Sequence, residues 1–337
     1  MADADEFKEW LRRDGWLRDP QAQLLPLRGG VSSEIYLVVD GAERFVVKRA
    51  LPKLKVRDDW FADPRRNVSE WNYFQCVSQF LPDAVPQLRF ANPSAGYFGM
   101  AYLGDDFANW KQLLLRGAGE IQSAQIAGRI LGTIHRETAN RPELRRRFDT
   151  LENFHQLRLA PYLLTTGERH PDLREFYEAE ATRLAAVKEC LVHGDFSPKN
   201  LLVCGARMVL LDAEVAWYGD AAFDVAFLLN HLFLKALYHA PRDPGIAEMI
   251  QMFWRTYRAE RSSTSRDLEI TVTRLLTLLL LARVDGKSPV EYLDSTRVAF
   301  IRNFVPSALA AQLPTVNALS ELWFDLLKIL PPLTAKT

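Results

Sequence analysis

The sequence predicts an α+β protein with two lobes, a small β-rich lobe followed by a larger and mainly helical one. The chain has 337 residues, which is enough for about two domains of ordinary size. Runs of β-branched and aromatic residues are frequent in roughly the first third of the chain, whereas apolar residues at helical spacing dominate from Val225 onward. The pattern changes near residues 101–105, so we expect one lobe over residues 1–103 and the other over residues 104–337.

Composition excludes several classes of protein. Lys plus Arg and Asp plus Glu both total 42, and this balance argues against a generic nucleic-acid-binding protein. Hydrophobic residues make up 48% of the chain, which excludes an acidic, disordered chain. Three scattered cysteines indicate a reducing, cytoplasmic compartment rather than a disulfide framework. The longest apolar run, Leu275 to Ala282, is far shorter than the roughly 20 residues of a membrane helix, so we expect no membrane partner.

The N-terminal lobe is predicted to contain strands around one helix. The dipeptide Asp40-Gly41 separates two β-rich runs, which is typical of a hairpin. The helix is expected to begin near Pro64, because proline is favourable in the first helical turn, and to end near Leu81. The predicted strands are residues 23–27, 34–39, 44–48, 85–90 and 97–103.

The C-terminal lobe is predicted to be helical around a small β-rich insert. Residues 121–134 carry an apolar helix face, and residues 140–190 are charged and helical in pattern. Short apolar runs between Leu191 and Leu211 then indicate strands, and apolar helices follow from Val225 to the end of the chain.

The strongest chemical signal is the segment 191–203, which reads LVHGDFSPKNLLV. Asp195 and Asn200 lie in a turn-rich loop between two short apolar strands, and Asp212 ends the strand that comes next. Phosphoryl transfer needs a carboxylate that deprotonates the attacking hydroxyl, and an amide oxygen and a second carboxylate that hold Mg²⁺ on the phosphates. We therefore predict Asp195 as the catalytic base and Asn200 and Asp212 as metal ligands. An Asx turn would explain a lone Asp and Asn, but not the combined pattern.

The pattern His-Gly-Asp-x-x-x-x-Asn, followed by a strand that ends in Asp, resembles the aminoglycoside phosphotransferase and choline kinase superfamily. It also resembles the His-Arg-Asp loop of protein kinases, with Gly194 where arginine usually stands. The resemblance covers nearly the whole chain and is weakest in residues 140–190. It implies a two-lobed protein-kinase-like fold and ATP-dependent phosphorylation of a hydroxyl on a small molecule, such as a sugar, an amino alcohol or an aminoglycoside.

The N-terminal lobe offers partners for the phosphates of ATP. Lys48 ends a predicted strand, where a lysine can reach the α- and β-phosphates, and a helix glutamate can hold it in place. Glu70 is the only acidic residue between Pro64 and Leu81, so it is the candidate for this role. A solvated strand lysine and a solvated helix glutamate are the alternatives for each residue taken alone.

Two further segments are candidates for nucleotide binding. The turn after residue 28 places Gly30, Ser32 and Ser33 where a phosphate-covering loop belongs, although the sequence lacks the G-x-G-x-x-G pattern of protein kinases. The segment 98–104 resembles the hinge of the superfamily, and there Ala101, Tyr102 and Leu103 would offer backbone groups to the base. An ordinary buried strand is the alternative for this second segment.

Two stretches are similar to 5-methylthioribose kinases, namely residues 46–52 and residues 211–220. The second stretch carries an Asp-x-Glu, which implies that Glu214 is a second carboxylate on the metal side. Arg283 resembles one of a pair of substrate-anchoring arginines, although Ala282 stands at the neighbouring position. Asn200 is a further departure, because methylthioribose kinases usually lack asparagine there. A surface charge for Glu214 and a structural ion pair for Arg283 are the alternatives.

Some polar residues of the same region are expected to act on the loop rather than on substrate. Asp224 resembles the aspartate that braces the catalytic loop in kinase-like folds. His193 is expected to orient the loop, and Lys199 is expected to be a solvated loop lysine.

Three other functions compete with a small-molecule kinase. A protein kinase is disfavoured, because only twelve residues lie from Asp212 to Asp224 and leave no room for a long activation segment. A nucleotide-binding pseudokinase is disfavoured, because the central polar residues are all present. Antibiotic inactivation within the same superfamily stays open. Polycationic aminoglycosides favour an acidic substrate lobe, and the sequence does not locate such a lobe.

Overall fold

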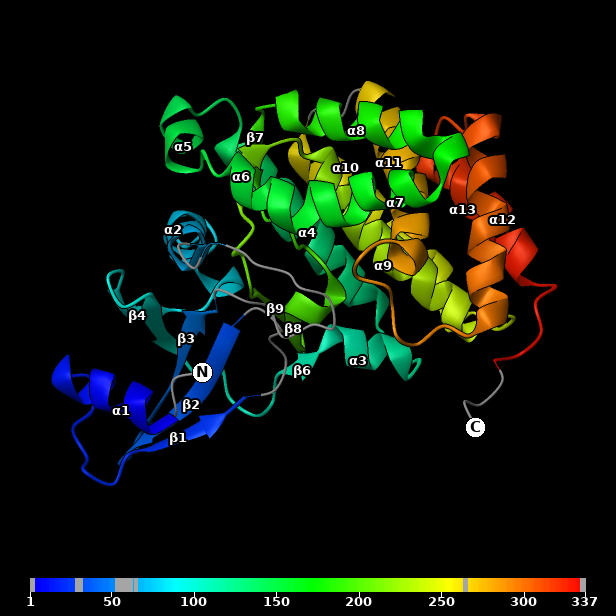
Figure 1. The fold of residues 1–337 in the computed structure, drawn as a ribbon. Coiled ribbons are helices and arrows are strands. Elements are labelled where there is room, and N and C mark those ends of the chain that lie inside the picture. Colours follow the sequence, from blue (N-terminus) through cyan, green and yellow to red (C-terminus); the bar gives the residue numbers. More distant parts are fainter. Residues whose placement is uncertain (1–3, 28–32, 52–62, 64–65, 263–265, 334–337) are drawn as a thin grey trace. The chain divides into compact units, whose positions relative to one another are not determined.

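The computed structural model describes residues 4–27, 33–51, 63, 66–262 and 266–333. The chain divides into two compact units, Met1–Asp106 and Phe107–Thr337. The first unit contains an antiparallel sheet, and the second is mainly helical (Figure 1). The predicted α+β class with a β-rich N-terminal lobe and a helical C-terminal lobe is therefore confirmed.

The first unit is built on a five-stranded antiparallel sheet with the strand order β1-β2-β3-β5-β4. The hairpin expected at Asp40-Gly41 joins β2 and β3, and Asp40 pairs with Glu43 beside the turn. The strands are β1 (Gln23–Pro26), β2 (Ser33–Asp40), β3 (Glu43–Ala50), β4 (Leu88–Asn92) and β5 (Tyr97–Ala101). The helical elements are α1 (Ala4–Arg13), α2 (Arg66–Val77) and a 3₁₀ turn, η1 (Pro82–Ala84).

Two elements of this unit differ from the prediction. Helix α1 is not among the predicted elements, and its buried face, Phe7 and Leu11, packs in the core of the sheet. Strand β4 begins at Leu88 rather than Val85, because η1 occupies the preceding residues and Pro86 has no N–H for a strand ladder.

The second unit surrounds two small β-structures with helices. Strand β7 pairs with β10, and β8 pairs with both β6 and β9. The strands are β6 (Ala108–Asn109), β7 (Cys190–Val192), β8 (Leu201–Cys204), β9 (Arg207–Leu210) and β10 (Trp217–Gly219). The strands expected between Leu191 and Leu211 are thus present as β7, β8 and β9.

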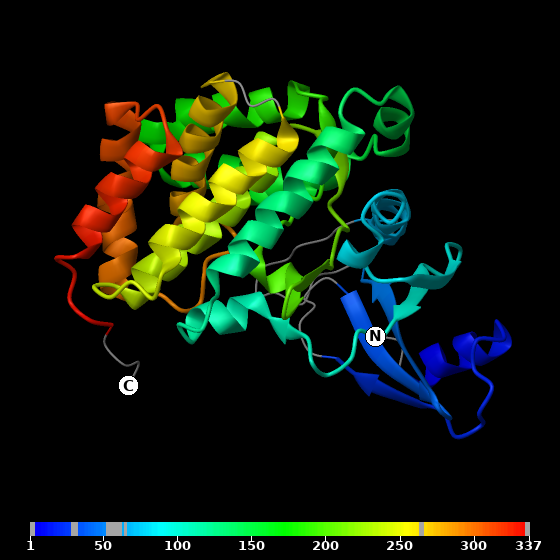
Figure 2. The same cartoon turned by 180° about the vertical axis from the view of Figure 1, so that it is seen from behind.

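One helix of this unit is buried on every side. All residues of α9 from Ala222 to Leu237 are buried, including the polar side chains Asp224, Asn230, His231 and Lys235. Figure 2 shows α10 running beside α4, and Gly128 permits this close approach because a Cβ there would lie 2.6 Å from the Phe253 carbonyl oxygen. The α-helices are α3 (Trp110–Leu115), α4 (Ile121–Thr138), α5 (Pro142–Arg147), α6 (Leu151–Phe154), α7 (Thr165–Arg169), α8 (Arg174–Ala186), α9 (Ala222–His239), α10 (Ile246–Arg261), α11 (Arg266–Asp285), α12 (Ser295–Ala311) and α13 (Val316–Leu327).

A π-helix, η2 (His155–Leu164), interrupts the helical region between α6 and α7. It contains Pro161, which cannot donate a backbone hydrogen bond, and such wide turns often occur at functional sites. Two short 3₁₀ turns complete the unit, η3 (Pro171–Leu173) and η4 (Pro198–Asn200). Within the described ranges, no helix combines the length and the apolar character needed to cross a membrane.

Candidate active site

The loop that carries Asp195 is held at both ends by paired strands. Strand β7 enters it and pairs with β10, while η4 leads out of it into β8, which pairs with β9. The Leu211 N–H donates to the Asn200 carbonyl oxygen at 2.9 Å and so joins the end of the loop to the chain just before Asp212. Asn200 and Asp212, two of the predicted metal ligands, are thereby held close to the same pair of strands, β8 and β9.

Asp224, in the first turn of α9, binds the start of the loop. Its two carboxylate oxygens accept the backbone N–H groups of His193 at 2.7 Å and Gly194 at 2.9 Å. Asp224 is fully buried, so these charge-assisted bonds are protected from water. The geometry agrees with the bracing role expected from the sequence.

Gly194 stands at the position where protein kinases have arginine, and the backbone explains why. Its φ is +76°, a left-handed conformation that residues with a side chain rarely adopt. A Cβ at this position would also lie 2.6 Å from the Val215 carbonyl oxygen. This loop therefore excludes any larger residue on two independent grounds.

His193 is a buried, neutral residue that orients the loop. Burial lowers the pKa of its imidazole below the usual value, although the nearby carboxylates of Asp224 and Asp195 oppose this. Its Nδ1 accepts the Asp195 N–H at 3.2 Å, which leaves Nε2 to donate to the Leu211 carbonyl oxygen at 3.2 Å. With both ring nitrogens engaged in these contacts, His193 fixes the backbone of Asp195.

The Asp195 carboxylate is buried between two cations. Its Oδ2 lies 2.8 Å from Lys199 Nζ and 3.0 Å from Arg158 Nη2. Burial raises the pKa of Asp195, but the charges of Lys199 and Arg158 outweigh that effect, so the pKa lies below its usual value. Asp195 is therefore ionised at neutral pH. Lys199 is exposed, as expected of a loop lysine, and its ammonium group also pairs with Asp195.

Arg158 is the residue of this site that the sequence reasoning missed. It lies in the π-helix η2, donates from Nε to the Gly194 carbonyl oxygen at 2.6 Å, and is buried. Its guanidinium also lies 5.6 Å from the ring centres of both Tyr162 and Phe227. No local pattern distinguishes this arginine from others in the charged segment 140–190, because its partners are far away in the sequence.

The candidate metal ligands are Asn200, Asp212 and Glu214. The Asn200 side-chain nitrogen donates to the Asp195 carbonyl oxygen at 3.0 Å, so its amide oxygen is the atom that suits a metal. Asp212 has a φ of +65°, a strained conformation of a kind that concentrates at functional sites. Glu214 is buried, and its charge acts on Arg158 together with that of Asp212.

The amide and carboxylate oxygens of these residues are the type of ligand that Mg²⁺ prefers, but they are too few to fill its coordination shell. The described side chains include no cluster of three or more His, Cys, Asp or Glu that could hold a metal ion alone. Mg²⁺ characteristically binds through one or two protein oxygens and keeps waters and phosphate oxygens as its other ligands. The residues present therefore fit a magnesium ion that arrives with a nucleotide.

The first unit contains a buried ion pair formed by two predicted residues. Lys48 Nζ in β3 lies 2.6 Å from Glu70 Oε2 in α2, and the two side chains are 2% and 1% exposed. The Asn67 side chain donates to the Lys48 carbonyl oxygen at 3.2 Å and joins the same helix to the same strand. Solvated positions for Lys48 and Glu70, the alternatives from the sequence, are therefore wrong.

The other nucleotide-binding candidates of this unit are only partly described. Ser33 is buried at the start of β2, whereas Gly30 and Ser32 lie outside the described residues. Ala101 ends β5, and its N–H donates to the Gln87 carbonyl oxygen at 2.8 Å. Tyr102 and Leu103 follow the strand and are partly exposed.

Arg283 lies near the end of α11, and its Nη1 is already engaged. It donates to the Tyr162 hydroxyl at 3.1 Å and to the Ser288 hydroxyl at 3.0 Å. Because Tyr162 also lies against Arg158, these contacts connect Arg283 to the surroundings of Asp195. The ion pair considered as its structural alternative is not found among the described residues.

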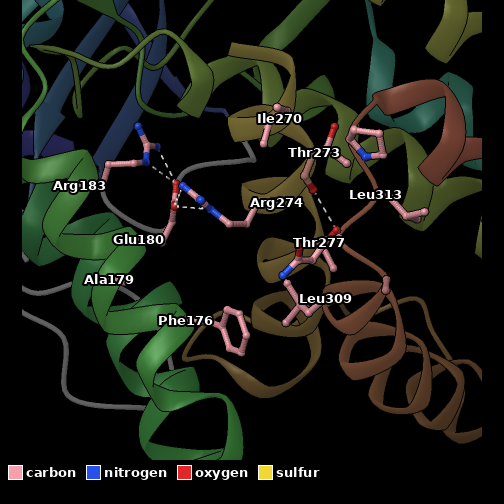
Figure 3. A pocket seen from close by; sticks show the side chains of 13 residues that line it. Phe176, Ala179, Glu180, Arg183, Ile270, Thr273, Arg274, Thr277, Leu309 and Leu313 are labelled. Atoms are coloured by element: carbon pink, nitrogen blue, oxygen red, sulfur yellow. Dashed lines mark hydrogen bonds and ion pairs between the residues drawn. The ribbon is translucent and has the colours of Figure 1, made fainter. Parts of the chain in front are cut away.

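A separate hollow of about 640 Å³ lies between α8, α11 and α12 (Figure 3). Glu180 at its wall is paired with Arg183 at 2.6 Å and with Arg274 at 2.8 Å. None of the predicted site residues lines this hollow, so it is distinct from the candidate active site.

Known proteins similar to this chain are small-molecule kinases. Residues 118–263, which include the Asp195 loop, match the model of a family described as "Phosphotransferase enzyme family". A methylthioribose kinase of Pectobacterium atrosepticum is 25% identical over 296 residues, covering 76% of this chain and 74% of that protein. A methylthioribose kinase of Geobacillus thermodenitrificans is 23% identical and covers 60% of this chain and 58% of that protein.

Solved structures show the same fold at lower sequence identity. An amicoumacin kinase, solved with AMP-PNP, Ca²⁺ and Ami, has a TM-score of 0.59 and 16% identity and covers 92% of this chain and 95% of its own. A microcompartment-associated aminopropanol kinase has a TM-score of 0.57 and 15% identity and covers 96% of this chain and 98% of its own. These findings confirm the resemblance to the aminoglycoside phosphotransferase and choline kinase superfamily, and with it the predicted enzyme class, a small-molecule kinase with an alcohol group as acceptor.

Proposed function

We propose that the chain transfers the γ-phosphoryl group of ATP to a hydroxyl of a small molecule, with Asp195 as the base. The acceptor hydroxyl gives its proton to the Asp195 carboxylate while its oxygen bonds to the γ-phosphorus. The bond from that phosphorus to the β,γ-bridging oxygen breaks, and ADP leaves. Asn200 and Asp212 would hold Mg²⁺, with Glu214 as a further carboxylate, and the ion would neutralise charge on the phosphates.

The observation that carries this proposal is the position of the Asp195 carboxylate between Arg158 and Lys199. Two cations keep the carboxylate ionised and fix its direction, which a general base requires. The positive φ of Asp212 is a second feature of a kind that concentrates at functional sites.

Further roles are proposed for residues that bind the nucleotide or the acceptor. Lys48 would hold the α- and β-phosphates, with Glu70 fixing its side chain. Gly30, Ser32 and Ser33 would cover the phosphates, and Ala101, Tyr102 and Leu103 would contact the base. Arg283 would contact the acceptor.

The test is acceptor-dependent release of ADP by the purified chain with MgATP. The acceptors should include methylthioribose, other sugars, hydroxy acids, amino alcohols and aminoglycosides, with the phosphorylated product identified by mass spectrometry. We expect stoichiometric ADP and phosphorylated acceptor for at least one member. Binding of MgATP without phosphorylation of any member would favour the pseudokinase alternative, and phosphorylation of a protein substrate would favour the protein-kinase alternative.

A further inference from the structure

Lys235 is a fully buried lysine without a carboxylate partner among the described residues. It lies in α9, and its Nζ is 3.3 Å from the His231 carbonyl oxygen and 3.4 Å from the Tyr292 hydroxyl. The ammonium group also lies 5.1 Å from the centre of the Tyr292 ring. Because burying an unpaired charge is costly, a lysine in such a place calls for an explanation.

Further cations lie near enough to Lys235 to affect its pKa. The pKa of Lys235 is lowered to about 7, chiefly by burial and then by the charges of Lys111 from α3 and Arg283 from α11, while Glu291 acts in the opposite direction. Glu291 is itself paired with Lys111, so it compensates that lysine first. His231, one turn before Lys235, has its pKa lowered well below the usual value, chiefly by burial and then by the charge of Lys235.

A line of contacts runs from Lys235 to the base Asp195. Phe227, His231 and Lys235 are spaced four residues apart, so they share one face of α9. The Phe227 ring centre lies 5.1 Å from that of His231 and 5.6 Å from the guanidinium of Arg158, the ion-pair partner of Asp195. The charge of Lys199, the other partner of Asp195, also acts on His231. An acceptor whose hydroxyl contacts Asp195 is therefore close to this face.

Positive charge exceeds negative charge around this face. Asp195 is the ion-pair partner of Arg158 and Lys199, and the charges of Asp212 and Glu214 also act on Arg158. Farther along the face, at His231, the acting charges are all positive, namely those of Lys235, Arg283, Lys199 and Lys111. Arg283 Nε is buried without a hydrogen-bond partner. Burial raises the pKa of Tyr162, but the charges of Arg283 and Arg158 outweigh that effect and bring it below the usual value. A cationic acceptor would be repelled here, whereas an anionic group would compensate the excess charge.

We propose that the acceptor carries an anionic group in addition to its hydroxyl, as a hydroxy acid does, and that Lys235 determines this specificity. The proposal rests on the proposed kinase function and adds a substrate class to it. Lys235 acts through its charge on the face shared with His231, so it is a specificity-determining residue rather than a catalytic one.

The test uses matched acceptors that differ in charge. One set is glycerate, glycerol and 3-amino-1,2-propanediol, and a second set is glucuronate, glucose and glucosamine. The values of kcat and KM are measured from pH 6 to pH 9 for the wild type, Lys235→Met, Lys235→Arg and the surface control Lys328→Met, whose side chain is 71% exposed. Calorimetric titration of glycerate and glucuronate in the presence of AMP-PNP and Mg²⁺ gives binding separately from turnover.

We expect the wild type and Lys328→Met to prefer the anionic member of a set by at least about tenfold in kcat/KM. The KM of that acceptor should rise above about pH 7 in the wild type, as Lys235 loses its proton, while kcat changes less. Lys235→Met should lose the preference and this rise, and Lys235→Arg should keep the preference without the rise. If Lys235→Met and Lys235→Arg both fail to fold, the wild type alone tests the inference. It must then show both the preference for the anionic acceptor and the rise of KM with pH.

Two results separate this inference from the function on which it rests. Turnover that favours the neutral or cationic members, or an anion preference that Lys235→Met keeps, would overturn the inference and leave the kinase function standing. Anion binding that depends on Lys235, without ADP release for any acceptor, would overturn the kinase function and leave the anion specificity standing. Absence of both anion binding and anion turnover in the wild type would overturn the inference.

Discussion

The residue before Asp195 must be glycine for both conformational and steric reasons. At Gly194 the backbone is left-handed, and the space for a Cβ is taken by the Val215 carbonyl group. Gly205 provides a matched comparison, since its φ is +55° but a Cβ at that position would have no other atom within 4 Å. The two positions therefore separate backbone strain from a steric clash.

We expect Gly194→Ala to lower the free energy of unfolding by about 3 kcal/mol or more, because strain and overpacking add. Gly205→Ala should cost about 1 kcal/mol, since only the strain applies. Urea unfolding monitored by circular dichroism checks both values. Equal effects of the two substitutions would contradict the role given to the Val215 contact.

Lys235 also makes stability depend on pH. Its pKa is about 7 in the folded chain against an ordinary value of 10.5. Between these values the unfolded chain binds the proton and the folded chain does not, so the contribution of Lys235 to stability rises as the pH increases from about 7 to about 10. We expect the wild type to gain stability relative to Lys235→Met between pH 7 and pH 9.5 in urea unfolding. A difference between the two proteins that does not change with pH would contradict the buried, unpaired state of Lys235.

The residues of the Asp195 loop could be predicted from the sequence, but the partners of its carboxylate could not. Asp195, Asn200 and Asp212 lie within one short stretch, where spacing carries information. Arg158 comes from a π-helix far away in the sequence, and the direction of Lys199 depends on the conformation of η4. Such contacts are consequences of tertiary structure, which a pattern of neighbouring residues does not contain.

Among the elements, helix α9 has the largest influence on the catalytic loop. Its first turn supplies Asp224, which accepts two backbone N–H groups of the loop, and one of its faces supplies Phe227 against Arg158. The His135 ring nitrogen Nε2 from α4 lies 3.5 Å from the same Asp224 carboxylate. The position of the loop therefore depends on α9 and, through His135, on α4.

We expect Asp224→Asn to lower the free energy of unfolding by about 1.5–3 kcal/mol per lost charged hydrogen bond, since one amide oxygen replaces two carboxylate oxygens. The value of kcat should fall, because the Asp195 backbone is no longer fixed, while binding of MgATP should change little. Urea unfolding and steady-state kinetics measure the two effects. Asp325→Asn, at an exposed carboxylate of α13, is the control and should change neither.

The buried pair between β3 and α2 allows stability and function to be separated. Breaking the pair with Glu70→Gln should cost about 3–5 kcal/mol, because the buried charge of Lys48 loses the carboxylate that lies 2.6 Å from it. The double variant Lys48→Met with Glu70→Leu should regain most of that stability and still lack turnover, since the lysine proposed to hold the α- and β-phosphates is gone. Recovery of turnover in the double variant would contradict the proposed role of Lys48.

The type and order of the elements could largely be predicted, because hydrophobic periodicity and turn residues are local signals. The β2–β3 hairpin and the strands around the catalytic loop follow from such signals. Helix α1 is not predicted, since its apolar residues Phe7 and Leu11 are buried only by the sheet on which they pack, and the local sequence does not show that contact. The π-helix η2 is also not predicted, because its wide turns reflect tertiary packing rather than propensity.

For the whole molecule, a net charge of zero conceals a local excess of positive charge. Arg158 and Lys199 pair with Asp195, and the charges that act on His231 are those of four cations, Lys235, Arg283, Lys199 and Lys111. A balanced total argues against binding to nucleic acid in general, and it says nothing about the charge of a substrate site. The charge preference that we propose would depend on these few residues.

The central claim is that Asp195 is the base of a phosphoryl transfer, and turnover of Asp195→Asn with saturating MgATP and acceptor tests it most directly. Asparagine preserves the shape of the side chain and cannot take the proton, so we expect kcat to fall by about 10²- to 10⁴-fold. Binding of MgATP, measured by calorimetry on the same protein, should stay within about threefold of the wild type. Turnover of Asp195→Asn equal to that of the wild type would contradict the account.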